Sequence, residues 1–222
     1  MDQVSGATSR AQTADERDAA IERAAAKGAY WTGSRLFVAL SAMLFGAGVF
    51  SYFYLHSLDS NGLWRAAGQR PSDFISIPVL VLTLVASGLF WFYTRSLQSL
   101  GKSRPGDWRV ATLAATLMFL AAGVLQFWGM NRTGFAAGSS GYASVYTATM
   151  PIFGVYLLGA AYWLETLFAR SVRVKWLLSP EGENRESSEL VAFVGSAVGA
   201  KLFVGFVSLV GIGLYVLFSV LN

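Results

Sequence analysis

The chain has 222 residues, of which 54% are hydrophobic and only 14% are charged, with 17 Lys and Arg against 13 Asp and Glu. About a quarter of the residues in a soluble domain are charged, so this composition excludes an ordinary soluble protein and predicts an integral membrane protein. The chain has no cysteine, which excludes disulfides and thiolate sites, and His56 is its single histidine. One histidine cannot build a multi-histidine metal or haem centre alone.

Residues 1–30 form a polar segment without the basic-then-apolar pattern of a cleaved signal peptide. The stretch from Thr13 to Glu16 has the spacing of a capping box, and an Ala-rich run to Lys27 is followed by Gly28, a typical helix end. We therefore expect a short helix on the membrane surface from Asp15 to Lys27, preceded by a polar tail and lying on the cytoplasmic side.

Five apolar segments predict an all-α fold, an integral membrane bundle of five transmembrane helices over residues 31–222. In the first segment, twenty residues without a formal charge separate Arg35 from His56, and as a helix they span about 30 Å, the thickness of a bilayer core. The predicted spans are about 36–55, 74–94, 110–130, 142–168 and 198–221.

The fifth apolar segment, from about Leu190 to Leu221, is long for a single span and contains Lys201. A lysine in mid-membrane costs about 2.5–3.5 kcal/mol on insertion scales, so we place the start of the span near Val198 and let Lys201 reach the interface. Residues 190–197 are then expected to form an interfacial extension.

The basic residues predict the orientation. Arg65, Arg70 and Arg132 lie in the first and third connections between the spans, which share one side of the membrane. The other Lys and Arg residues, of 17 in all, lie on the opposite side. The positive-inside rule places that richer side in the cytoplasm, so the N-terminus is cytoplasmic and the C-terminus external. We expect a multi-pass protein of a bacterial inner membrane. The richer side comprises Arg10, Arg17, Arg23, Lys27, Arg35, Arg95, Lys102, Arg104, Arg109, Arg170, Arg173, Lys175, Arg185 and Lys201.

The predicted spans contain almost no ionisable residues, apart from Glu165 and Lys201 near their inner ends. Proton relays and substrate sites in membranes use such residues, so the pattern disfavours a self-contained transporter or enzyme and favours a packing partner. We therefore predict no catalytic, cofactor-binding or metal-binding residue in this chain, and no nucleic-acid partner. The small-xxx-small spacing of Gly195 and Gly199 predicts a close helix crossing. Further candidates for close helix packing are Gly46, Gly48, Gly154 and Gly159.

Several stretches resemble five-span subunit III of cytochrome c oxidase. They are Leu36-Phe-Val-Ala-Leu-Ser-Ala-Met-Leu-Phe45 with Tyr52-Phe-Tyr-Leu55 in span 1, and Gly141-Tyr-Ala-Ser-Val-Tyr146 at the entry to span 4. Trp108 at the start of span 3 and Gln126-Phe-Trp128 at its end also fit. The similarity covers about residues 32–159, and span 5 by position alone.

The chain departs from the family pattern at three polar positions. Ser41 stands where the family has a membrane glutamate, and Ile152 and Val155 stand where it has two histidines. The resemblance therefore implies the scaffold and the association of the family, and not a role in proton uptake.

By this resemblance the chain is a non-catalytic subunit of a haem-copper oxidase that stabilises catalytic subunit I. Haem and copper are expected in the partner subunits of the respiratory complex, which oxidise cytochrome c or quinol and reduce O₂. A bound phospholipid is expected in a cleft between helices 1–2 and helices 3–5. Two alternatives stay open: a subunit III-like protein of a nitric oxide reductase system, and an unrelated membrane scaffold or transporter.

Overall fold

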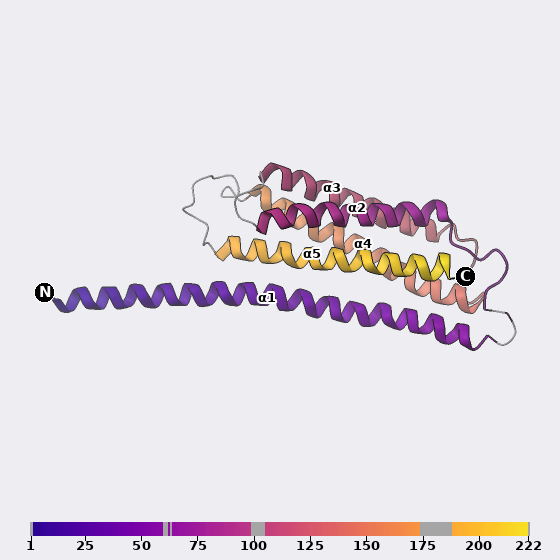
Figure 1. Cartoon of the computed structure of the whole chain (residues 1–222), viewed down its shortest axis with the longest axis horizontal. Coiled ribbons are helices and arrows are strands. Elements are labelled where there is room, and N and C mark those ends of the chain that lie inside the picture. The colour runs from indigo at the N-terminus through magenta and orange to yellow at the C-terminus, as the bar shows by residue number, and fades with distance from the viewer. Residues whose placement is uncertain (1, 60–61, 63, 99–104, 174–187, 222) are drawn as a thin grey trace.

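The computed structural model describes residues 2–59, 62, 64–98, 105–173 and 188–221 (Figure 1). These residues form helices and no strand, which confirms the predicted all-α fold. In chain order the helices are α1 (Asp2–Ser57), α2 (Asp73–Gln98), α3 (Pro105–Met130), α4 (Gly141–Arg173) and α5 (Ser188–Tyr215), and a π-helical turn, η3 (Val216–Val220), continues α5.

Five segments of these helices are long and apolar enough to cross a membrane, which confirms the predicted number of candidate spans. Each includes most of the corresponding predicted range and is longer than predicted, the first, fourth and fifth by the most. The segments are Gly28–Ser57, Asp73–Arg95, Asp107–Met130, Gly141–Val172 and Ala192–Val220.

The five helices lie side by side, and the two termini lie at opposite ends of the bundle (Figure 1). α5 packs against α1, α2 and α4, and α3 packs between α2 and α4. In the most apolar stretch of 18 residues of α5, 56% of the residues are buried, whereas the share is 17% in the corresponding stretch of α1. α5 is therefore a central helix and α1 a peripheral one, held mainly by α5 and to a lesser extent by α4.

The predicted end of a separate surface helix at Gly28 is wrong, because α1 is one continuous helix from Asp2 to Ser57. Neither Gly28 nor Gly33 interrupts it. A glycine inside a helix costs about 1 kcal/mol relative to alanine, whereas starting a new helix carries its own nucleation cost. Helix-forming residues on both sides of Gly28 therefore favour continuation, and the N-terminal part of α1 extends beyond the other helices (Figure 1).

The packed part of α5 begins before Val198, the predicted start of the fifth span. Phe193 is 3% exposed and its ring packs against Trp108 of α3, with 5.4 Å between the ring centroids. Ala197 is fully buried. Residues around 193–197 therefore pack into the bundle as the rest of α5 does, and their expected place at the membrane interface stays a prediction. The Lys201 ammonium lies 4.0 Å from the ring centroid of Trp91 on α2.

The C-terminal end of α5 is held by side chains from the connections and from α4. The Tyr142 hydroxyl donates to the Phe218 carbonyl at 2.9 Å, and the Arg70 guanidinium donates to the Ser219 carbonyl at 2.9 Å. These bonds satisfy carbonyls that a helix end leaves without helical partners. The same end joins the two connections, because Gln69 bonds the hydroxyls of Ser139 and Ser140.

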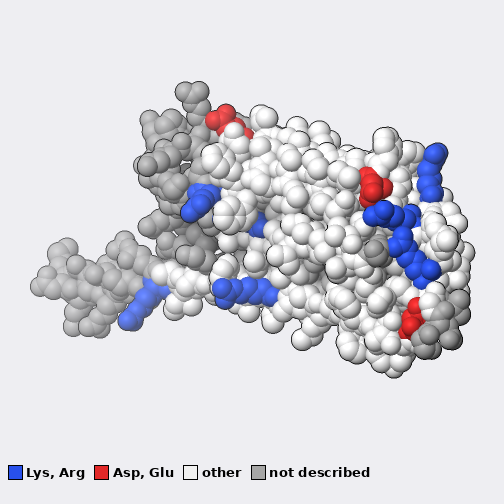
Figure 2. Space-filling view, turned by 45° about the vertical axis from the view of Figure 1, so that its right-hand side comes forward, with Lys and Arg blue, Asp and Glu red and all other residues white. Residues whose placement is uncertain are grey.

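Charged side chains gather at the ends of the bundle. Figure 2 shows the middle of the visible face almost without Lys, Arg, Asp or Glu, and residues of both signs at each end. This pattern fits an apolar membrane layer between polar ends. Four residues used to predict the orientation, Lys102, Arg104, Lys175 and Arg185, lie outside the described residues.

Candidate functional site

The small-xxx-small pair of α5 lies against α1. A Cβ added at Gly195 would lie 3.3 Å from the Cβ of Tyr30, and one at Gly199 would collide with the Oγ of Ser34 and lie 3.3 Å from its Cβ. Tyr30 and Ser34 are one turn apart, as are the two glycines, so the two helices meet along matching rows. Because Gly195 and Gly199 carry no side chain, α1 can approach α5 closely at these two positions.

The other glycines singled out from the sequence divide into two groups. A Cβ at Gly48 would lie 3.1 Å from the Thr149 hydroxyl on α4, and a Cβ at Gly154 would lie 2.9 Å from the Phe127 ring on α3. Gly46 and Gly159 have no such neighbour within 4 Å. The first two serve helix contacts, and the last two face outward from the described bundle.

Sequence reasoning missed four glycines at close contacts. A Cβ at Gly123 would lie 2.6 Å from Leu158, and one at Gly129 would lie 2.7 Å from Ile75. Gly141 and Gly211 are similarly close to Trp64 and Phe153. None of the four has a second glycine four residues away in its own helix, so the spacing rule gave no signal.

Ser41 is 2% exposed and joins α1 to α4. The Tyr156 hydroxyl donates to the Ser41 Oγ at 2.8 Å, and the Ser41 hydroxyl donates to the Phe37 carbonyl at 2.7 Å. The serine is thus fully engaged in packing. Ile152 is partly buried on α4, and Val155 is 60% exposed, so these two positions do not lie together in a polar site with Ser41.

A cluster of hydroxyls joins α2 to α5. The Ser208 Oγ lies 2.6 Å from the Ser87 Oγ, and the Ser87 hydroxyl donates to the Val204 carbonyl at 3.1 Å. On α2, the Thr83 hydroxyl donates to the Val79 carbonyl at 2.7 Å. All three hydroxyl-bearing residues are at most 7% exposed. The contact therefore stabilises two central helices without placing a charge in the core.

In the part of the chain that the structure describes, α2 packs along both α3 and α5, so the helix pairing does not separate helices 1–2 from helices 3–5 as the expected cleft requires. Two open grooves lie elsewhere. One, of about 310 Å³, lies between α1 and α4 and includes Tyr30, Gly33 and Trp163. The other, of about 450 Å³, lies between α2 and α3 and includes Phe74 and Trp128. Both are lined mainly by apolar side chains.

Within the described ranges, no group of three or more His, Asp or Glu residues could hold a metal ion. His56 is exposed at the end of α1, where its ring stacks on Tyr52 with 6.3 Å between centroids and meets Trp64 edge-on at 5.5 Å. The histidine is thus part of an aromatic contact at one end of the bundle.

No protein-family model matches this chain, and no curated protein matches its sequence. The resemblance to subunit III therefore rests on the stretches quoted from spans 1, 3 and 4. The close contacts and hydrogen bonds of the described residues hold the helices together.

Proposed function

We propose that the chain is a non-catalytic, subunit III-like component of a haem-copper oxidase in a bacterial inner membrane, where it stabilises the catalytic subunit by lateral packing. The observation that carries the proposal is the contact between Ser41 and Tyr156 at 2.8 Å. The position that the resemblance assigns to a membrane glutamate holds a hydroxyl bonded within the bundle. This supports a packing role there and not a role in proton transfer.

The outer faces of the helices suit lateral association. α1 presents Leu40, Met43 and Phe50 with exposed fractions of 67%, 74% and 69%. Apolar side chains of this kind are compatible either with lipid tails or with the apolar flank of another membrane subunit. Haem and copper belong to the partner subunits in this proposal, and they supply the redox chemistry of the complex.

Phospholipid binding is part of the same proposal, with its place revised. The α1–α4 groove and the α2–α3 groove are open and apolar, as acyl chains require. Next in the chain to Ser34, which lines the first groove, the Arg35 guanidinium lies 3.8 Å from the ring centroid of Trp31. A cation near the membrane surface attracts anionic lipid headgroups, so Arg35 is placed to contact a lipid whose chains occupy that groove.

Affinity purification from native membranes tests the proposal. A tag at the N-terminus of the full chain, extraction in a mild detergent and a reduced-minus-oxidised absorbance spectrum are sufficient. We expect haem bands and oxygen consumption to copurify with the chain, and not with an equally tagged, unrelated membrane protein from the same cells. Recovery of a stable, haem-free chain would contradict the proposal.

A further inference from the structure

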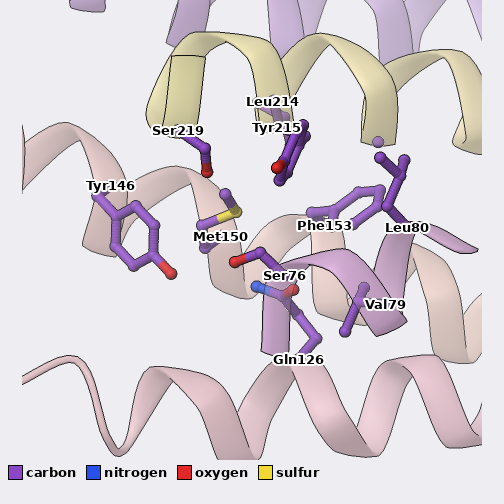
Figure 3. Close-up of a pocket in the computed structure, with 11 residues that line it drawn as sticks. Ser76, Val79, Leu80, Gln126, Tyr146, Met150, Phe153, Leu214, Tyr215 and Ser219 are labelled. Atoms are coloured by element: carbon purple, nitrogen blue, oxygen red, sulfur yellow. The ribbon is translucent and has the colours of Figure 1, made fainter. Parts of the chain in front are cut away.

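A small, partly open cavity lies between α2, α3, α4 and the C-terminal part of α5 (Figure 3). Its volume is about 30 Å³. Unlike the two side grooves, it is lined by several polar side chains among apolar ones. The polar residues are Ser76, Gln126, Tyr146, Tyr215 and Ser219.

The polar groups point toward one another across the cavity. Figure 3 shows the Gln126 amide in the centre, with the hydroxyls of Ser76, Tyr146 and Ser219 directed into the same space. The burial is high, because Gln126, Tyr146 and Ser219 are 8%, 5% and 3% exposed. These groups come from four different helical segments, so a ligand here contacts all of them.

The side chains of Gln126, Tyr146 and Ser76 form no hydrogen bond with any described residue of the chain. The contrast with nearby groups is clear, since the Tyr142 hydroxyl, one turn away, donates to the Phe218 carbonyl at 2.9 Å. A buried amide brings two donors and an acceptor, and leaving them unpaired is costly. The lining therefore favours a hydrogen-bonding occupant over an apolar one.

We propose that this cavity is a binding site for ordered water, which bridges the Gln126 amide to the hydroxyls of Tyr146 and Ser76. A buried water needs about 10–15 Å³ of such volume and two to four polar partners, so the space of about 30 Å³ admits about two molecules. The water links α2, α3 and α4, and the hydroxyl of Ser219 extends the network to the π-helical turn. The site is independent of the complex to which the chain belongs.

Radiolytic hydroxyl-radical footprinting of the full chain in lipid nanodiscs tests the site, because radicals formed from bound water oxidise the side chains beside it. Met150 and Tyr146 line the cavity. We expect both to be oxidised several-fold faster than Tyr142, which is fully buried and bonded to protein. Labelling of Met150 and Tyr146 no faster than that of Tyr142 would overturn the proposal.

Two variants locate the water at the named groups. Gln126→Leu keeps the volume of the side chain and removes the amide, and Tyr146→Phe removes only a hydroxyl. We expect each to reduce Met150 oxidation, the first to the level of Tyr142. The matched control is Ser87→Ala, since the Ser87 hydroxyl is bonded within the protein, and Met150 oxidation should stay at the wild-type rate. Unchanged Met150 oxidation in both cavity variants would contradict the assignment.

Discussion

At position 41 a hydroxyl takes the place that the resemblance assigns to a carboxyl. The comparison with the family pattern identified the serine at this position, but it did not indicate what the serine contacts. Nothing in the sequences of α1 and α4 shows that Tyr156 lies opposite Ser41. The structure supplies that partner at 2.8 Å. A serine can donate to its own helix and accept from the neighbouring one, which a buried carboxylate cannot do.

A double-mutant cycle measures this contact. Ser41→Ala and Tyr156→Phe each remove one partner of the interhelical hydrogen bond, and each should destabilise the bundle. We expect a coupling free energy of about 0.6 kcal/mol, within an upper range of about 1.7 kcal/mol, as for other hydrogen bonds between membrane helices. Unfolding in mixed micelles with increasing SDS gives the four free energies. Strictly additive effects would show that the two hydroxyls do not interact.

Two glycines predicted alike from the sequence should respond differently to alanine. At Gly199 the added methyl group meets Ser34, whose hydroxyl is held at 2.7 Å from the Tyr30 carbonyl, so we expect a loss of about 1–3 kcal/mol. At Gly159 nothing lies within 4 Å, and alanine should be neutral or stabilise by up to about 1 kcal/mol. The same SDS unfolding assay compares them, and equal effects would contradict the assigned packing.

At the scale of elements, the apolar runs predicted the number of spans, because a run of about twenty uncharged residues is a strong signal. The ends of the helices and spans were less predictable than their number. Gly28 was interpreted as a helix end, yet α1 continues through it to Ser57. The interpretation of Lys201 as a marker of the interface stays a prediction. The error at Gly28 arose because a local rule for helix ends was applied where the long helix on both sides decides.

The π-helical turn η3 had no signal in the sequence. It is fixed by contacts from distant positions, among them the bond from Arg70 to the Ser219 carbonyl at 2.9 Å. We expect Arg70→Ala to loosen this turn and to accelerate amide hydrogen exchange at residues 217–221. Arg132→Ala is the control, because Arg132 is exposed and lies against Trp128 of α3 instead. Unaltered exchange in Arg70→Ala would show that the guanidinium does not hold the turn.

At the scale of the whole molecule, the pairing of helices was beyond the sequence. The resemblance implied that helices 1 and 2 stand apart from helices 3 to 5, whereas α2 packs against α3 and α5. Which helices pack together depends on which glycines and hydroxyls face each other across the contact, as Ser87 and Ser208 do. The sequence of a single helix does not show which residue of another helix it will face.

The orientation in the membrane can be measured cleanly because the chain has no cysteine of its own. We expect Asn131→Cys to react with an impermeant maleimide added outside intact spheroplasts, since the connection after α3 is predicted to be external. Arg17→Cys should react only after the membrane is permeabilised. Both residues are exposed, so access and not burial decides the outcome. The reverse pattern would contradict the predicted cytoplasmic N-terminus.

The central claim is that this chain is a packing subunit beside a haem-bearing membrane protein. Native mass spectrometry of the tagged chain, released from native membranes in detergent, tests it most directly. The account predicts a complex whose mass contains this 23.9 kDa chain, a larger multi-span subunit and haem, with phospholipid retained. A stable species with the mass of this chain alone, or a complex without haem, would contradict it.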